Sequence, residues 1–263
     1  SMDPEIHDSF RGIPGAWRRT VEGIRNVVAT PGVRCGIATC FTRQTVHRAP
    51  EMIRFAIDLG VQTFVHFNFI PVGRGVEMGH EEMTVEQREW LLQLLKDTLN
   101  EGKIGIMSTA PQFGRVCVMF SDPDAMVAMG HAGSGKGRQA RVVSKYIGGC
   151  GALRCYCCVE PNGRVTPCVY MPGVELGDLR RKRFAEIWNH PLESVFCDRD
   201  DLGDHCGACH YRAYCGGCRA RALAYTGDSQ AGDPGCVYNR HMWDEILSRG
   251  ENDREVQHGI AGM

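Results

Sequence analysis

The chain has 263 residues, 43% of them hydrophobic and 23% charged, with a formal net charge of −1, and it is long enough to bury a sizeable core. Without a basic excess, nucleic acid and acidic membrane surfaces are excluded as expected partners. The longest apolar runs are far shorter than the roughly 18 residues of a membrane span and no signal peptide opens the chain, so we expect a cytoplasmic protein.

The first half of the sequence alternates between helical and strand patterns. In chain order, we expect a helix over 15–28, a strand over 33–42, a helix over 49–60, a strand over 61–71, a helix over 84–100 and a strand over 104–109. Gly60 and Gly102 are the expected left-handed stops of two helices, and Thr84 with Gln87 forms a capping box. Strands that alternate with helices in this way predict a parallel sheet.

The middle strand of this array has one apolar face and one partly polar face. His66 and Asn68 share the polar face with Phe64. We expect this face to point away from the helices, into an open or closed α/β barrel, where ligands bind at the C-terminal ends of the strands. Asn68 would then lie nearest to a ligand. A buried, hydrogen-bonded core histidine is the alternative interpretation of His66.

Residues 121–149 are rich in glycine and partly polar, which predicts a linker or a mobile loop at a domain boundary. The "GSGKG" stretch within them is not a phosphate-binding loop, because it lacks the required spacing and the Ser or Thr after the lysine.

The 14 cysteines are the most unusual feature of the composition. Cytosolic thiols are kept reduced, so dense cysteines in a chain without an export signal indicate metal binding rather than disulfides. Ten of them are concentrated in the second half: Cys150, Cys155, Cys157, Cys158, Cys168, Cys206, Cys209, Cys215, Cys218 and Cys236. The isolated ones, Cys35, Cys40, Cys117 and Cys197, are expected to be core or surface thiols.

Iron-sulfur clusters and zinc are the two metal centres that these thiols could hold. Asn162-Gly163 predicts a tight hairpin with a cysteine on each side, at Cys158 and Cys168. A zinc ribbon pairs two CxxC units about 15 to 20 residues apart, and the gap within 206–218 is too short for that. Crowded thiols, with glycines that free backbone N–H groups for inorganic sulfide, favour an iron-sulfur cluster, and zinc is the alternative.

The cysteine pattern resembles that of radical S-adenosylmethionine enzymes that carry a SPASM auxiliary-cluster domain. The matching parts are Cys150, "GRVTPC" ending at Cys168, "CGACHYRAYCGGC" over 206–218, and Cys236. "CGGCRARALAYTGD" with "DPGC", "HDSFRGIPGAW" and "HFNFIPVGRG" resemble one branch of this family. That branch includes haem-pathway enzymes, the pyrroloquinoline-quinone and mycofactocin peptide enzymes, and a presumed tungsten-cofactor enzyme.

The resemblance implies two auxiliary clusters, expected to be 4Fe-4S, held by interleaved groups of cysteines. We call these groups the first thiol set, Cys150, Cys157, Cys168 and Cys218, and the second thiol set, Cys206, Cys209, Cys215 and Cys236. Cys157 matches the family position best, and Cys155 and Cys158 are further candidates for the fourth ligand of the first cluster. Such clusters relay electrons or bind substrate in the family.

The CxxxCxxC motif that defines the family does not occur in these 263 residues. We therefore expect the chain to be the C-terminal part of a longer enzyme, which would hold S-adenosylmethionine and a third 4Fe-4S cluster only when intact. The expected fold is α/β: the C-terminal half of a partial (β/α)6 TIM-like barrel over 1–120, a linker over 121–149, a SPASM domain over 150–245 and a polar tail over 246–263.

In the intact enzyme, the resemblance implies a 5'-deoxyadenosyl radical that abstracts a hydrogen from the substrate. Barrel-lining groups expected at the cofactor are Thr39, Thr42, His66, Asn68 and Ser108. Asp8 either lines the substrate side or caps the helix that begins near Gly15. We expect a tetrapyrrole substrate and an electron donor such as ferredoxin or flavodoxin. The alternatives are a ribosomal peptide, a tungsten cofactor, or a module without catalytic activity, and these residues alone are not expected to be active.

Overall fold

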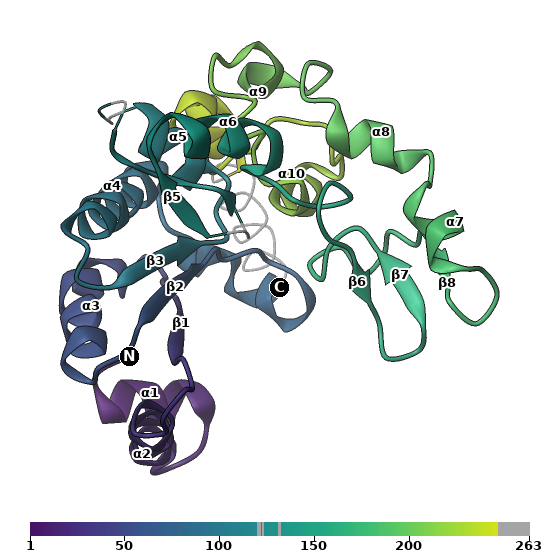
Figure 1. Cartoon of the computed structure of the whole chain (residues 1–263). Helices are drawn as coiled ribbons and strands as arrows, with labels where there is room; N and C mark the ends of the chain where they lie inside the picture. The colour runs from purple at the N-terminus through teal and green to yellow at the C-terminus, as the bar shows by residue number, and fades with distance from the viewer. Residues whose placement is uncertain (120–121, 123, 131–132, 247–263) are drawn as a thin grey trace, which may run out of the picture.

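The computed structural model describes residues 1–119, 122, 124–130 and 133–246. One side of the molecule is built around the sheet β1–β2–β3, with α3 and α4 along it (Figure 1). The other side carries the small strands β6, β7 and β8 with the short helices α7 and α8 (Figure 1). The predicted polar tail lies outside the described residues, apart from 246.

The first sheet is parallel, as the alternation of helices and strands predicted. Its strands are β1 (Gly36–Cys40), β2 (Thr63–Phe67) and β3 (Gly105–Ser108), with β2 in the centre. In register, Ile37 pairs with Phe64 and Phe64 with Ile106, so three apolar side chains form one row across the sheet. The α/β fold is therefore confirmed in this part of the chain.

The three predicted helices of this half begin and end close to the expected positions, as α2 (Ala16–Val28), α3 (Ala49–Asp58) and α4 (Val85–Glu101). The structure adds two helices that were not predicted, α1 (Pro4–Arg11) and α5 (Gln112–Met119), and the 3-10 turns η1 (Val46–Arg48) and η2 (Gly73–Glu81). Both halves of the Thr84–Gln87 capping box are present, and Gly102 ends α4 in the left-handed conformation. Asp8 accepts hydrogen bonds from the backbone of Gly15 and Trp17, so it caps α2.

The expectation that the polar face of β2 points away from the helices is wrong. Phe64, which shares this face with His66 and Asn68, lies in the same core cluster as Ile53 of α3 and Leu92 of α4. His66 is 0% and Asn68 is 2% exposed, whereas the residues of the opposite face are half-buried. Helices cover the partly polar face because it carries Phe64, and its polar groups find partners inside that core.

The segment predicted to be a linker contains regular structure. It forms an antiparallel pair, β4 (Met126–Ala128) and β5 (Ser134–Lys136), followed by α6 (Gly137–Ile147). Gly135 lies directly against α6, since a Cβ added there would lie 2.8 Å from Ala140 Cβ. The glycines of this segment therefore serve close packing as well as turns.

The cysteine-rich half forms a second sheet and a second core. Its elements are β6 (Cys158–Val159), β7 (Arg164–Thr166), β8 (Gly177–Asp178), α7 (Phe184–Trp188), α8 (Leu192–Cys197), α9 (Asp204–Ala208), α10 (Arg219–Thr226) and η4 (Val237–Asn239). β6 and β7 pair antiparallel around the predicted Asn-Gly turn, where Gly163 has a φ of +84°. The core of this half combines Val165, Met171 and Ile187 with Cys168 and Cys218.

Across the described ranges, every helix is too short or too polar to cross a lipid bilayer.

Candidate metal centres

Three thiols of the first set lie near the hydroxyl group of one tyrosine. The Tyr156 hydroxyl donates a hydrogen bond to Cys168 Sγ at 3.5 Å. Burial raises the pKa of Tyr156, and nearby charge on Cys150, Cys168 and Cys218 raises it further. The chain arrives at this place from the end of α6, from the β6–β7 hairpin and from the start of α10, so three separate elements position these thiols.

Three cysteines, Cys155, Cys157 and Cys158, remain candidates for the fourth ligand of the first predicted cluster. Cys155 lies within electrostatic reach of Cys150, and Cys158 within reach of both Cys168 and Cys157. Cys157 is half-buried beside the core that contains Cys168.

All four thiols of the second set line a single cavity. Its walls are formed by Arg115, His205, Cys206, Cys209, Arg212, Cys215, Gly216, Gly217 and Cys236. The thiols come from α9, from the loop before α10 and from the start of η4, and each is buried. In the described part of the chain, no three His, Cys, Asp or Glu side chains are grouped so as to hold a metal ion. The second set therefore lines one small cavity of about 10 Å³ without forming a ready-made site for a single ion.

Burial opposes ionisation of these thiols while no metal is bound. It raises the pKa of Cys215 well above its ordinary value, and nearby charge on Cys236 and Cys206 adds to the effect. It raises the pKa of Cys236 to about 12, although the Arg115 guanidinium acts in the opposite direction. A bound metal would supply the positive charge that holds such thiols as thiolates.

Hydrogen-bond donors point at the sulfur atoms of the second set. The backbone N–H of Gly217 donates to Cys215 Sγ at 3.3 Å, and that of Asp233 donates to Cys206 Sγ at 3.3 Å. Asn239 Nδ2 donates to Cys206 Sγ at 3.5 Å. Donors of this kind stabilise thiolate ligands and tune iron-sulfur clusters.

Buried guanidinium groups also surround the cavity. Arg115 reaches it from α5 and forms a bidentate ion pair with Glu89. Nη2 of Arg219 has no hydrogen-bond partner among the described residues, and it lies beside Gly217, where an added Cβ would be 3.2 Å from Cys206 Sγ. Unpaired cationic donors next to four thiols fit an anionic cluster, so the residues present suit the group that the sequence predicted.

The two thiol sets are in direct contact through the backbone. Cys150 N–H donates to the carbonyl oxygen of Cys215 at 3.2 Å. Buried Arg199 binds both chain segments, since it donates to the carbonyls of Gly148 and Cys150 on one side and of Arg212 on the other. These contacts hold the segments of the two thiol sets together, and the interleaved ligation implied by the resemblance stays a prediction.

The five barrel residues predicted at the cofactor fall into three places. Thr39, His66 and Ser108 occupy the same register position across the sheet, and Ser108 Oγ bonds His66 Nδ1 at 2.9 Å. Burial lowers the pKa of His66 to about 3, with a smaller contribution from the charges of Arg88 and Arg221, so this imidazole is neutral.

Thr42 and Asn68 lie apart from that row. Thr42 belongs to the turn after β1, where its hydroxyl contacts Thr45 Oγ1 at 3.3 Å. Asn68 Oδ1 accepts hydrogen bonds from Arg88 and Arg221. For all five of these residues, the role in cofactor binding stays a prediction.

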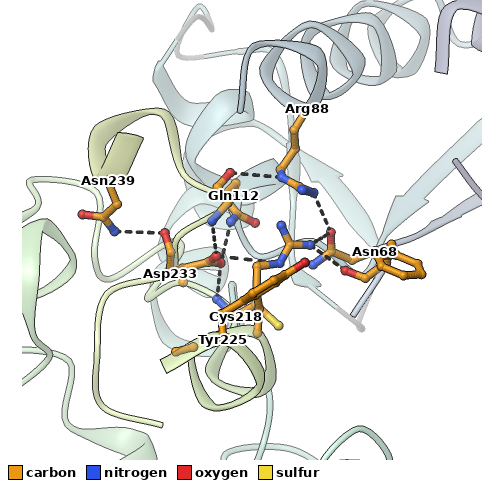
Figure 2. Close-up of polar contacts among 12 residues, drawn as sticks. Asn68, Arg88, Gln112, Cys218, Tyr225, Asp233 and Asn239 are labelled. Carbon is orange, nitrogen blue, oxygen red and sulfur yellow. Dashed lines mark hydrogen bonds and ion pairs between the residues drawn. The ribbon is translucent and has the colours of Figure 1, made fainter. Parts of the chain in front are cut away.

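Sequence reasoning missed a buried polar network that joins the two halves of the chain. Figure 2 shows Asn68, Arg88 and Gln112 from the first half close to Cys218, Tyr225 and Asp233 from the second. Glu82, also buried, pairs with Arg88 and accepts a hydrogen bond from the Tyr225 hydroxyl. Directly bonded partners in this network are separated by up to 153 positions, so no local pattern could have revealed them.

The chain is similar to known proteins over most of its length. Residues 150–210 match SPASM, described as an iron-sulfur cluster-binding domain. An AdoMet-dependent heme synthase of Methanosarcina barkeri is 32% identical over 240 residues, covering 89% of this chain and 64% of that protein. A PqqA peptide cyclase of Gluconobacter oxydans is 30% identical over 254 residues, covering 94% of this chain and 62% of that protein.

A solved structure shares the fold. SuiB of Streptococcus suis, bound to S-adenosylmethionine, aligns with a TM-score of 0.60 and 16% identity over 90% of this chain and 52% of SuiB. The chain thus spans less than two thirds of the length of the relatives it matches. Together with the thiol sets, these matches identify the chain as a member of the radical S-adenosylmethionine/SPASM family, with an iron-sulfur cluster-binding SPASM domain.

Proposed function

We propose that the two thiol sets hold two auxiliary 4Fe-4S clusters, the first on Cys150, Cys168, Cys218 and one of the three neighbouring cysteines, the second on Cys206, Cys209, Cys215 and Cys236. The observation that carries the proposal is that four thiols from three elements line one cavity with Arg115. Bound clusters of this kind supply one-electron transfer. The residues of this chain orient the ligands, exclude water and balance the charge.

Zinc is the competing occupant, and two features speak against it. A structural zinc ion draws four ligands to distances near 2.3 Å from one point, whereas no three His, Cys, Asp or Glu side chains of the described residues are grouped in this way. N–H donors and unpaired guanidinium donors around the thiols suit a larger anionic group with several sulfur atoms.

Metal analysis after anaerobic purification tests this proposal. About eight irons with matching sulfide per chain are expected for two cubane clusters. Cys209→Ser should lose about half of the iron, because it removes a ligand of one cluster only. The matched control is Cys197→Ser, a cysteine of the same half that belongs to neither set. Zinc without sulfide, or equal iron loss in both variants, would contradict the assignment.

For the whole protein, we propose a role in modifying a tetrapyrrole by hydrogen abstraction. The chain would contribute strands four to six of a partial barrel over 1–120 and a SPASM domain over 150–245, working in the cytoplasm with a ferredoxin or flavodoxin. Support comes from relatives named AdoMet-dependent heme synthase and pre-heme d1 synthase. A peptide substrate is the second candidate, favoured by the PqqA peptide cyclases and by SuiB bound to its precursor peptide SuiA.

A titration with iron coproporphyrin III, the tetrapyrrole in the name of another relative, distinguishes these substrates. A saturable shift of the porphyrin absorbance band is expected for the tetrapyrrole proposal. No shift, with binding of a ribosomal precursor peptide instead, would move the proposal to the peptide enzymes.

A further inference from the structure

Asp233 is a fully buried carboxylate at the centre of the polar network in Figure 2. Its Oδ2 accepts hydrogen bonds from the backbone N–H of Cys218 at 2.7 Å and from Gln112 Nε2 at 2.6 Å. Its Oδ1 accepts one from Gly235 N–H at 2.9 Å and lies 3.8 Å from Arg221 Nε. The carboxylate therefore holds a cysteine of the first thiol set by its backbone.

The backbone of the same residue contacts the second thiol set. Asp233 N–H donates to Cys206 Sγ at 3.3 Å. Asn239 Nδ2 bridges the two, since it donates both to the Asp233 carbonyl at 3.0 Å and to Cys206 Sγ. Asp233 is thus bonded to one predicted ligand of each cluster, although Cys206 and Cys218 lie 27 and 15 positions away in sequence.

We propose that Asp233 is a positioning residue for both auxiliary clusters, and that its buried negative charge lowers the reduction potential of each. This inference rests on the two clusters of the proposed function. A buried charge acts strongly because the surrounding dielectric is low, and cluster potentials respond to nearby charge and to hydrogen bonds. The carboxylate also engages the Cys218 N–H, so this donor is withheld from cluster sulfur.

The network fixes the carboxylate in this role. Gln112 reaches it from α5, and Arg221 joins it to Asn68 at the end of β2. Arg221 is shared with a second buried carboxylate, Glu82, whose Oε1 lies 3.6 Å from Arg221 Nη1. Glu82 bonds Arg88, Arg221 and Tyr225, and these bonds include no thiol of either set. Asp233 and Glu82 are therefore both fully buried and both lie close to Arg221. They differ in that only Asp233 bonds cysteines of the two thiol sets.

Redox titration of the purified, reconstituted chain, followed by electron paramagnetic resonance, tests the inference. Asp233→Asn removes the charge at nearly constant volume, so the midpoint potentials of both clusters should rise. Glu82→Gln, the matched control, should leave both potentials close to those of the unaltered chain. Equal potentials in Asp233→Asn and the unaltered chain, or an equal rise in Glu82→Gln, would overturn the inference.

Gln112→Met provides an independent test of the reduction potentials if Asp233→Asn fails to retain its clusters. It removes one donor from the carboxylate and keeps the charge, so the potentials should fall. It also removes Gln112 Oε1, a buried acceptor with no partner in the described structure. Potentials that do not fall would overturn the inference. Absence of iron and sulfide from the unaltered chain would instead refute the proposed clusters themselves.

Discussion

The contact between Gly149 and Cys215 allows a quantitative test of how the thiol sets are interleaved. Gly149 has a φ of +75°, and an added Cβ would overlap the Cys215 carbonyl oxygen and lie 2.6 Å from its carbonyl carbon. The left-handed conformation costs a non-glycine residue about 1–2 kcal/mol, and forced overlap in a packed site costs about 1–3 kcal/mol more. Gly149→Ala should therefore lower the free energy of unfolding by about 2–5 kcal/mol.

Gly227→Ala provides the matched control, because it separates the backbone effect from the overlap. Gly227 ends α10 with a φ of +78°, and nothing lies within 4 Å of its added Cβ. Only the conformational cost of about 1–2 kcal/mol is expected there.

Urea unfolding of the metal-free chain, followed by circular dichroism, measures both variants. Since whole domains are stable by only about 5–15 kcal/mol, the larger loss is easily resolved. Iron content after reconstitution should also fall in Gly149→Ala and stay unchanged in Gly227→Ala. Equal unfolding midpoints for the two variants would refute the close contact between Gly149 and Cys215.

Three further predictions concern charge and metal. Burial lowers the pKa of His66 from 6.5 to about 3, so its ring signals in nuclear magnetic resonance should not titrate between pH 8 and 5. Because only the unfolded chain takes up this proton near neutral pH, the free energy of unfolding should decline as the pH falls below about 6.5. A ring titration near pH 6.5 would contradict this prediction. Glu89→Ala leaves buried Arg115 unpaired and should cost about 3–5 kcal/mol in urea unfolding. The control Glu86→Ala breaks an exposed ion pair with Arg240 and should lower the free energy of unfolding by at most about 1 kcal/mol. Equal losses of stability in Glu86→Ala and Glu89→Ala would contradict the prediction for Arg115. Removal of iron and sulfide should accelerate amide hydrogen exchange over 206–236 and leave the exchange rates of β1–β3 unchanged. Equal acceleration in both regions would contradict the presence of two separate cores.

Local signals explain why the elements of the first half could be predicted. The Thr84–Gln87 capping box and the left-handed Gly102 act within a few residues, so the sequence reveals the limits of α4 directly. The Asn-Gly turn specifies the β6–β7 hairpin for the same reason. Thiol spacing, read with the family resemblance, indicated the metal centres before any geometry was known.

Long-range packing explains what could not be predicted. A strand period of two shows that His66 and Asn68 share a face, but it does not say which face the helices cover. Their burial depends on Arg88, Ser108 and Arg221, which approach from distant elements. Asp233 belongs to the "DPGC" stretch that resembles the family, but no local pattern reveals its contacts with Cys218, Cys206 and Gln112, which lie 15, 27 and 121 positions away.

The hydrogen bond from Cys150 N–H to the Cys215 carbonyl has a consequence for protein engineering. A segment ending before residue 206 would retain the hairpin cysteines but lose Cys218 and the carbonyl on which Cys150 is anchored. A segment beginning after residue 168 would keep the whole second thiol set and leave Arg199 without the carbonyls of Gly148 and Cys150. The two thiol sets are therefore expected to transfer to another scaffold only together, as one inseparable unit.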